Sequence, residues 1–483
     1  MSGQMSHLLW SDHSRRGPVT DGAVSGAAGG SACGDLARIS LSLDGGRITE
    51  VSFDSEGCAA TSAACAAAGE LAEGSSAIDA ARIGAPEIDS ALGGLSPAMR
   101  HAAGLAADAL HRALAATAAS GRQLAEAGDG RVLVAMSGGV DSATAALMER
   151  ERGADVVAVT LKLWADRRTD GERSCCSPGA VISARELAHS LGLPHFTLDL
   201  ENRFRAEVVD RFVSGYAAGR TPNPCVLCNG EVRIEAMADL AGRLGAAHLV
   251  TGHYARIVDD GEGPLLAAAA DPAKDQSYML GALPPRVLGR LRFPLAEMRK
   301  PAVRALAQRH GLAVARRPDS QDLCFLAGRG KRSFLREHGG IEDREGSIVD
   351  AGGRALARHR GQHHFTVGQR RGIGVAAAEP LYVLATDADT NTVAVGTRAE
   401  LQTDAVAVRD VTLHRRADRV DRVRLRYRSR TVGCSMSAAE AGRHESLELQ
   451  LSEPFAGAAP GQLAALMSGE TIVGHGTIAP DLA

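Results

Sequence analysis

One short loop constrains this sequence more than any other feature. Ser137-Gly-Gly-Val-Asp-Ser142 lies between a run typical of a buried strand, Arg131–Met136, and a helix predicted over Ser142–Arg150. Glycines allow backbone N–H groups to close around an anion, and the N-terminus of the helix adds positive potential. The pattern GxxxxGK[ST] of a Walker loop does not occur in the sequence. The loop therefore predicts a phosphate-binding site of another kind at the end of a strand.

The residues after this loop repeat an alternation of strands and helices. Strands are predicted at 156–163, 195–199 and 247–251, with helices near 179–191, 202–216 and 229–243. This alternation is typical of an α/β domain with a doubly wound parallel sheet. Two strands joined at a Gly-Gly turn near residue 45 predict a small α+β unit before it. Short alternating segments beyond residue 326 predict small β-rich domains after it.

These patterns divide the chain into six parts. We predict a flexible tail over 1–30, a small α+β domain over 31–122 and a linker over 123–130. An α/β phosphate-loop domain over 131–325 is followed by a small β-rich domain over 326–400 and a β-barrel-like domain over 401–483.

The net charge of −3 hides an asymmetry between segments. Residues 1–125 hold 8 Arg and no Lys against 13 acidic residues, whereas residues 299–371 hold 16 basic against 7 acidic residues. Such a basic segment suits a nucleic-acid partner. We expect a cytoplasmic protein with no membrane partner, because no apolar run of about 18 residues and no secretory signal are found. An odd count of nine cysteines argues against a disulfide framework.

Further motifs follow the phosphate loop in order. They are Arg220-Thr-Pro-Asn-Pro-Cys-Val-Leu-Cys-Asn229, Thr251-Gly-His-Tyr-Ala-Arg256, Lys274-Asp-Gln-Ser-Tyr-Met-Leu280, Asp319-Ser-Gln-Asp-Leu-Cys-Phe325, Gly368-Gln-Arg-Arg-Gly372, Arg426-Tyr-Arg428 and Pro460-Gly-Gln462. Over roughly 131–483 the chain thus resembles the tRNA-specific 2-thiouridylases, the MnmA/TrmU family of PP-loop ATP pyrophosphatases. The resemblance implies an enzyme that adenylates the wobble uridine of tRNA and replaces its C2 oxygen by sulfur, releasing AMP and pyrophosphate.

The resemblance also implies roles for single residues. Cys324 would carry a persulfide and Cys228 would be the second catalytic cysteine, and the two could close a disulfide during turnover. Asp141 would bind Mg²⁺. The residues at ATP would be Ala135, Met136, Ser137, Gly138, Gly139, Val140, Asp141, Ser142, Leu161 and Gly252. The residues at the target base or elsewhere on tRNA would be Asn223, Pro224, Cys225, His253, Lys274, Asp275, Gln276, Arg426, Tyr427 and Gln462.

Cys225 departs from the pattern of the family, in which many members carry Asp at this position. Cys225, Cys228 and Cys324 together offer three thiolates, which suit a 4Fe-4S cluster with one open iron that could hold sulfide. Zinc is the alternative metal, and a persulfide on Cys324 without any metal is the alternative mechanism. A CxxC pair does not by itself choose between them.

Residues 31–119 resemble the IscU/NifU family of iron–sulfur scaffold proteins. The ligand set of that family is matched by Cys33, Asp35, Cys58 and His101, whereas the expected third cysteine is Ala102. Cys65 lies two helical turns after Cys58 and could share a helix face with it. We interpret this domain as a transient carrier of sulfur or clusters. A domain retained only for docking or stability is the alternative.

Partners and competing functions follow from these features. We expect the basic segment 299–371 to hold the anticodon stem-loop of tRNA, and a cysteine desulfurase or sulfur-relay protein to supply sulfur. ATP and Mg²⁺ are the expected cofactors, with a 4Fe-4S cluster as an option. The alternatives are another PP-loop ligase or amidotransferase, and a non-catalytic iron–sulfur carrier. The paired cysteines argue against the first alternative and the intact phosphate loop against the second.

Overall fold

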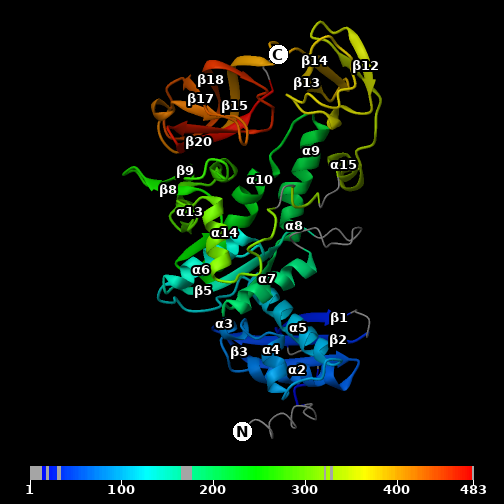
Figure 1. Cartoon of the computed structure of the whole chain (residues 1–483), viewed down its shortest axis with the longest axis vertical. Helices are drawn as coiled ribbons and strands as arrows, with labels where there is room; N and C mark the ends of the chain where they lie inside the picture. The colour runs from blue at the N-terminus through cyan, green and yellow to red at the C-terminus, as the bar shows by residue number, and fades with distance from the viewer. Residues whose placement is uncertain are drawn as a thin grey trace.

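The computed structural model describes residues 14–17, 21–29, 34–164, 177–319, 323–326 and 330–480. Figure 1 shows the N-terminal domain at one end of the long axis, the parallel-sheet domain in the middle and two β-rich domains at the other end. This succession confirms the predicted fold class. Within the described ranges no helix is both long and apolar enough to cross a membrane.

The N-terminal domain, which we call the head (described residues between 14 and 119), packs helices against an antiparallel sheet. The strands, in the order β1-β2-β3, are β1 (Val24–Gly29), β2 (Leu36–Asp44) and β3 (Arg47–Glu56). The helices are α2 (Ala59–Ala72), α3 (Ala77–Ala80), α4 (Ala85–Ala91) and α5 (Arg100–Ala119). Alternate residues of β2 and β3, including Ile39, Leu41 and Phe53, are fully buried, as expected for strands with one face on the core.

Strand β1 differs from the sequence prediction, which assigned residues 1–30 to a flexible tail. All six of its residues pair with β2. Gly26 lies so close to α5 that an added Cβ would be 2.2 Å from the backbone nitrogen of Ala113. The helix can approach the strand only where the strand residues are small. A Gly/Ala/Ser stretch carries no β-branched signal, so the sequence pattern missed this strand.

The central domain contains five parallel strands in the order β10-β7-β4-β5-β6. They are β4 (Arg131–Ala135), β5 (Asp155–Lys162), β6 (His195–Asp199), β7 (His248–Thr251) and β10 (Leu291–Arg292). The chain runs from β4 outward to β6 and then returns to the other side of β4 with β7. Strands β4 and β7 therefore form the topological switch point, where open α/β sheets bind their ligands. The phosphate loop directly follows β4 and leads into α6 (Val140–Glu151).

The remaining helices surround this sheet or connect it to the β-rich domains. They are α7 (Pro178–Ser190), α8 (Glu201–Phe204), α9 (Asp210–Ala217), α10 (Pro224–Leu227), α11 (Ile234–Arg243), α12 (Ser277–Leu280), α13 (Pro285–Leu288), α14 (Lys300–Arg309) and α15 (Lys331–Gly339). Two π-helical segments, Arg205–Val209 and Cys228–Arg233, join α8 to α9 and α10 to α11 without a break.

Two β-rich domains follow the central domain. The first has the strand order β12-β11-β14-β13, with β11 (Gly346–Val349), β12 (Ala355–His359), β13 (Tyr382–Asp387) and β14 (Thr392–Gly396). The second contains β15 (Gln402–Leu413), β16 (Arg422–Arg424), β17 (Val432–Met436), β18 (Gly442–Ala456), β19 (Leu463–Ser468) and β20 (Thr471–Ile478), and a β15–β20 pairing closes the sheet. A hairpin of the central domain, β8 (Arg256–Asp259) and β9 (Pro264–Ala267), also pairs with β20. The C-terminal sheet therefore includes strands from before residue 325.

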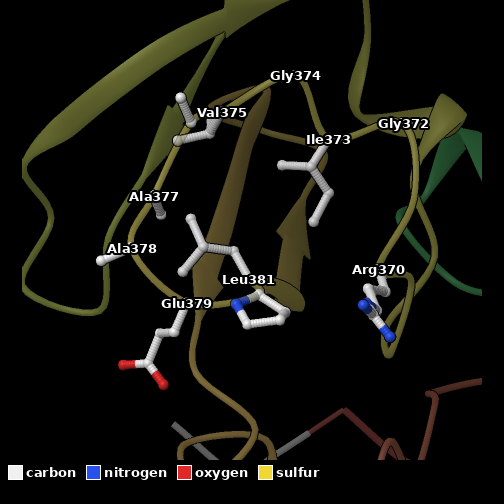
Figure 2. A pocket seen from close by; sticks show the side chains of 11 residues that line it. Arg370, Gly372, Ile373, Gly374, Val375, Ala377, Ala378, Glu379 and Leu381 are labelled. Carbon is white, nitrogen blue, oxygen red and sulfur yellow. The ribbon is translucent and has the colours of Figure 1, made fainter.

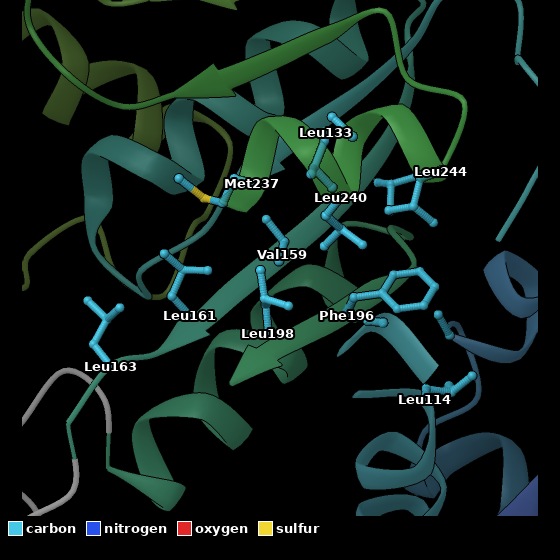
Figure 3. Close-up of a cluster of buried hydrophobic side chains, with 14 of the residues drawn as sticks. Leu114, Leu133, Val159, Leu161, Leu163, Phe196, Leu198, Met237, Leu240 and Leu244 are labelled. Atoms are coloured by element: carbon cyan, nitrogen blue, oxygen red, sulfur yellow. The ribbon is translucent and has the colours of Figure 1, made fainter. Parts of the chain in front are cut away.

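The head packs directly on the central domain. Helix α5 contacts β6, and Figure 3 shows Leu114 of α5 near Phe196 of β6 beside the core of the central sheet. Arg185 of α7 forms an ion pair with Asp108 of α5. Buried residues of the two domains belong to one continuous hydrophobic cluster. The contact is therefore a packed interface, and the linker is not the only connection.

Two histidines donate hydrogen bonds to the backbone of the head at this interface. Nε2 of His189 lies 3.0 Å from the carbonyl oxygen of Ala81, and Nε2 of His111 lies 2.9 Å from that of Ile83. Burial, together with the positive charge of Arg185, lowers the pKa of both imidazoles, that of His111 far below its usual value. Both side chains are therefore neutral at pH 7.

A third histidine connects the interface to the phosphate loop. The backbone N–H of His195 donates to the carbonyl of Ala81 (3.0 Å). Its Nε2 lies 2.8 Å from Oγ1 of Thr160, which in turn donates to the carbonyl of Met136 (2.8 Å). Because the hydroxyl proton of Thr160 is used, Nε2 of His195 carries the proton of this imidazole. Met136 directly precedes the phosphate loop, so head and loop share one chain of hydrogen bonds.

We expect the head to detach as the pH falls below about 6.5. A histidine whose pKa is lowered by docking is neutral in both states above its ordinary pKa of about 6.5, so it does not oppose docking there. Below that pH the undocked histidine takes up a proton that the docked one does not. The docking equilibrium constant then falls about tenfold per pH unit for each such proton. The charged groups that face them are Arg185, Arg82, Asp108 and Glu87. Limited proteolysis of the linker should therefore accelerate at least about tenfold between pH 7.5 and pH 5.5.

The variant His111→Gln, which keeps a neutral donor, should weaken this pH dependence. His444→Gln, at a partly exposed position of the C-terminal barrel, is the matched control and should leave it unchanged. Equal cleavage rates of the wild type at both pH values would contradict the prediction.

Candidate active site

The phosphate loop is held in shape by its two serines. Oγ of Ser142 accepts from the backbone N–H of Ser137 (3.1 Å) and donates to the carbonyl of Gly139 (3.1 Å). Gly138 has φ +71°, a conformation that favours glycine. The loop therefore closes over the N-terminus of α6, with Gly139 as its N-cap. Backbone N–H groups and the helix dipole meet here, as an anion site requires.

Gly252 places the end of β7 against this loop. An added Cβ at this position would lie 2.7 Å from the backbone nitrogen of Ser142, in contact with backbone that cannot move aside. The two sides of the switch point thus meet at a residue that the sequence assigned to ATP. We expect Gly252→Ala to displace the loop and to lower ATP-dependent turnover about a hundredfold, since a shift of about 1 Å can have this effect. Pyrophosphate release measures it, and Gly289→Ala, with no atom closer than 3.8 Å, is the control.

Asp141 is the centre of an ion-pair network that the sequence did not predict. Nζ of Lys300 donates to both of its carboxylate oxygens (2.7 and 2.6 Å), and the hydroxyl of Tyr254 donates to Oδ1 (2.8 Å). Lys300 also binds Asp319 (2.9 Å). Burial and the negative charge of Asp141 raise the pKa of Tyr254, so its hydroxyl stays a donor. Asp141 therefore accepts three hydrogen bonds, two of them from a cation.

Asp319 carries further cationic partners. Nζ of Lys274 donates to its Oδ2 (2.7 Å) and Arg304 donates to its Oδ1 (2.7 Å). Burial alone would raise the pKa of Asp319, but the two lysines more than offset it and lower the pKa to about 2. Lys274 thus lies in this network, whereas the sequence assigned it to tRNA. A sequence signal for the network exists: an arginine-rich chain contains only four lysines, and two of them bind Asp319.

Cys225 and Cys228 lie on the first turns of the long helix that runs through α10 and α11. The side chain of Asn223 caps its N-terminus by accepting from the backbone N–H of Cys225 (3.1 Å) and Val226 (3.3 Å). Cys228 is buried and begins the π-helical segment, an irregularity that often marks functional sites. Burial raises the pKa of the Cys225 thiol, and the charge of Arg233 partly opposes this.

Cys324 lies in a short turn that an aromatic cluster anchors. Its neighbour Phe325 is buried, with ring contacts to Phe212 (5.2 Å) and Phe334 (5.0 Å). Cys324 itself is half-buried. None of the six cysteines within the described ranges is in a disulfide bond.

The three thiols do not form a compact ligand set for one ion. Among the described residues, Cys225, Cys228 and Cys324 are not a group whose ligand atoms all lie within 4.8 Å of one another. A single tetrahedral zinc with Zn–S bonds of about 2.3 Å needs its thiolates about 3.8 Å apart. The arrangement therefore does not fit zinc. Cluster ligands bind different irons and lie farther apart, so it does not exclude a cluster.

Several residues assigned to tRNA make internal contacts between domains. Nε2 of Gln462 donates to the carbonyl of Thr221 (2.7 Å), which holds the barrel against the loop before Cys225. The carboxylate of Asp275 accepts from Arg424 (2.7 Å) in the barrel and from Ser277. Gln276 and His253 form hydrogen bonds within the central domain, to Tyr254 and Thr251 respectively. Tyr427 of the barrel lies beside Tyr278, and Arg426 is exposed.

In the head, the structure brings together three of the four predicted ligands. Asp35 lies 3.2 Å from Sγ of Cys58 and 3.4 Å from Nε2 of His101, and Thr61 donates to it (2.6 Å). The ligand atoms of Asp35, Cys58 and His101 all lie within 4.8 Å of one another, which fits one metal ion. The hydrogen bonds from Thr61 and Cys58 lower the pKa of Asp35 and keep it ionised. Cys33 lies outside the described residues.

Cys65 does not join this site. Cys58 is the exposed N-cap of α2, whereas Cys65 faces the core with no exposed surface. Burial raises the pKa of Cys65 to about 12, so it is a protonated core residue. Cys65 therefore does not replace the missing third cysteine beside Cys58, because it lies in the core while Cys58 lies at the exposed start of the helix with Asp35 and His101.

A further group of metal-ligand types lies in the first β-rich domain. His363 and His364 form a 3₁₀ turn, and Nε2 of His364 lies 3.1 Å from Asp343, which also binds Arg332. The nearby loop that contains the Gly368–Gly372 motif encloses a hollow. Figure 2 shows Arg370 and Glu379 on opposite sides of this hollow and the apolar side chains Ile373 and Leu381 between them.

The fold and the site define a nucleotide-using enzyme with a phosphate loop at the switch point of a parallel sheet. Family models match four successive regions: the NifU-like N terminal domain (9–122), the tRNA methyl transferase HUP domain (130–328), the tRNA methyl transferase PRC-barrel domain (332–397) and the aminomethyltransferase beta-barrel domain (404–478). A bifunctional protein NifU/MnmA of Rubrobacter xylanophilus is 47% identical over 467 residues, which cover 94% of this chain and 93% of that protein. The chain therefore belongs to the bifunctional NifU/MnmA family.

Single-function relatives match the part after the head. The tRNA-specific 2-thiouridylases MnmA of Acidithiobacillus ferrooxidans and Xanthobacter autotrophicus are 41% and 43% identical. Each match covers 72% of this chain. The matches cover 98% of the Acidithiobacillus protein and 92% of the Xanthobacter protein. The resemblances found in the sequence are thus confirmed: a NifU-like domain precedes an MnmA enzyme, a tRNA-specific 2-thiouridylase.

Proposed function

We propose that this enzyme thiolates C2 of the wobble uridine of tRNA with ATP, and that Cys324 and Cys228 carry the sulfur chemistry. The observation that carries the proposal is the placement of the phosphate loop at the switch point, tied through Asp141, Lys300 and Asp319 to the chain segment that leads to Cys324. Membership in the NifU/MnmA family supports the same substrate.

The reaction divides into two steps. The C2 oxygen of uridine attacks the α-phosphorus of ATP, and pyrophosphate leaves. The terminal sulfur of a persulfide on Cys324 then attacks C2, and AMP leaves with the former oxygen. The thiolate of Cys228 attacks Sγ of Cys324, so that a Cys228–Cys324 disulfide forms and 2-thiouridine is released. A dithiol reductant must then restore both thiols.

The residues around the loop would serve the first step. Backbone N–H groups of Gly138 and Gly139 would hold phosphate oxygens, with the N-terminus of α6 adding positive potential. Mg²⁺ would be held by the ATP phosphates together with the carboxylate of Asp141, which Lys300 contacts at both oxygens. Asn223 would act through the helix that it caps, by fixing the position of Cys225 and Cys228.

Sulfur could instead be held as sulfide on a 4Fe-4S cluster. Cys225, Cys228 and Cys324 would be its ligands, and the cluster would supply an open iron as the sulfur site. Burial raises the pKa of the Cys225 thiol, and binding to a metal would stabilise its thiolate. The persulfide mechanism needs no such partner for Cys225.

The variant Cys225→Ala separates these two mechanisms. If a cluster is present, anaerobically purified protein should contain iron and sulfide, absorb broadly in the visible region and lose both colour and activity on this substitution. If a persulfide on Cys324 is the donor, the variant should retain at least about half of the wild-type activity without iron. Iron and sulfide analysis beside tRNA thiolation assays measures both outcomes.

The head is proposed to carry sulfur or a nascent cluster to the enzyme, with a cysteine desulfurase as the upstream donor. Its compact Asp35, Cys58 and His101 site supports this role. After deletion of residues 1–125, turnover with free sulfide should survive, and turnover from cysteine plus a desulfurase should slow. Equal slowing with both sulfur sources would indicate that the head only stabilises the phosphate loop through the His195 contacts.

The test of the proposed function is pyrophosphate release that depends on tRNA. Pyrophosphate release without tRNA, or release that requires ammonia as the nucleophile, would favour a ligase or amidotransferase. No release under any condition, with clusters still transferred to an acceptor protein, would favour a carrier.

A further inference from the structure

Lys300 connects two carboxylates that lie far apart in the sequence. It is the first residue of α14, and its side chain is only 9% exposed. Of its three ammonium protons, two are directed at the oxygens of Asp141 and the third at Oδ1 of Asp319 (2.9 Å). The backbone N–H of Lys300 donates to Asp271 (2.9 Å), which fixes the start of the helix.

The two carboxylates belong to different functional segments. Asp141 is part of the phosphate loop. Asp319 is five residues before Cys324, at the end of a segment that also touches the phosphate loop through Arg317, which donates to the carbonyl of Gly138 (3.0 Å). Lys274 pairs with Asp319, whereas Lys300 pairs with both carboxylates and so joins the nucleotide side to the thiol side by an ion pair at each.

We infer that Lys300 is a positioning residue that makes the seating of Cys324 respond to nucleotide. This inference rests on the proposed function, because it takes Ser137–Ser142 as the ATP site. A triphosphate brings several negative charges to the loop, and these compete with Asp319 for the ammonium group of Lys300. Nucleotide binding therefore weakens the Lys300–Asp319 pair and loosens the turn at 323–326 when the adenylate is to be attacked.

Thermodynamic linkage makes the effect measurable in both directions. If nucleotide loosens the turn by a given factor, loosening the turn must tighten nucleotide binding by the same factor. Coupling of this kind is typically about 5-fold or more. A purely structural ion pair would stabilise the protein but would not transmit a response to nucleotide.

The experiment is amide hydrogen exchange, read at residues 323–326 of the full-length protein. It is run with and without Mg²⁺ and the non-cleavable analogue adenosine 5′-(α,β-methylene)triphosphate. In the wild type the analogue should speed exchange at these residues about 5-fold or more. In Lys300→Met, exchange should be fast without nucleotide and should no longer respond. Lys300→Arg should restore the response, and Asp319→Asn should resemble Lys300→Met.

Arg422→Met, which removes an exposed ion pair with Asp421 in the C-terminal barrel, is the matched control and should behave as the wild type. Exchange in strand β3 of the head is the internal reference. If the analogue speeds exchange at 323–326 as much in Lys300→Met and Asp319→Asn as in the wild type, the inference is overturned. The proposed function would still stand in that case, provided that the wild type thiolates tRNA. Failure of the wild type to bind the analogue would overturn the proposed function itself.

Discussion

Cys324→Ala and Cys228→Ala will each abolish formation of 2-thiouridine and will leave tRNA binding close to that of the wild type. The first substitution removes the sulfur atom that carries the persulfide, and the second removes the thiolate that releases the product. Each loss should exceed about 10³-fold, because no neighbouring group can replace a covalent sulfur carrier. Nucleoside analysis of the tRNA product and filter binding of labelled tRNA measure the two quantities separately.

Cys434→Ala is the matched control for these variants. Cys434 lies in β17 of the C-terminal barrel, where burial raises its pKa to about 11, and its removal should leave thiolation unchanged. Near-normal 2-thiouridine in either catalytic variant would refute the assignment of that cysteine.

Asp141→Asn will prevent adenylation even when sulfur is supplied in excess. The substitution removes the negative charge that anchors Lys300 and Tyr254, and it removes the carboxylate predicted to approach Mg²⁺. We expect AMP and pyrophosphate release to fall by at least about 10²-fold, a typical loss when one electrostatic contact to the reacting groups is removed.

Asp239→Asn serves as the control for this variant, because Asp239 forms only an exposed pair with Arg243 within one helix. If Asp141→Asn releases AMP at the wild-type rate, the loop at 137–142 is not the ATP site. If it binds the ATP analogue but does not release pyrophosphate, the residue acts in the chemical step.

Local sequence patterns predicted the parts of this fold that local physics determines. The strand before Ser137, the glycines after it and the helix from Val140 are neighbours in the chain, so their meaning can be read from spacing alone. The same holds for Asp44-Gly-Gly46 and the two strands that it joins. Strand β1 was missed because its small residues serve a close contact with α5, and that contact exists only in the folded head.

Contacts over long sequence distances account for what the sequence did not predict. Lys300 and Asp141 are 159 positions apart, and nothing in the residues around Lys300 indicates a partner. Gln462 lies in a motif that suggested tRNA, yet its amide holds the barrel against Thr221. A sequence motif does not say which contact its residues make. Only the folded structure distinguishes a contact with substrate from a hydrogen bond between domains. The docking of the head through His111, His189 and His195 has the same origin.

The most direct test of the account is mass spectrometry of nucleosides from tRNA incubated with the purified full-length protein, ATP, Mg²⁺ and a sulfur source. The account predicts 2-thiouridine at the wobble position, formed in equal amount to the pyrophosphate released and only when ATP and tRNA are both present. Pyrophosphate released without tRNA, or tRNA that contains no 2-thiouridine after ATP has been consumed, would contradict it.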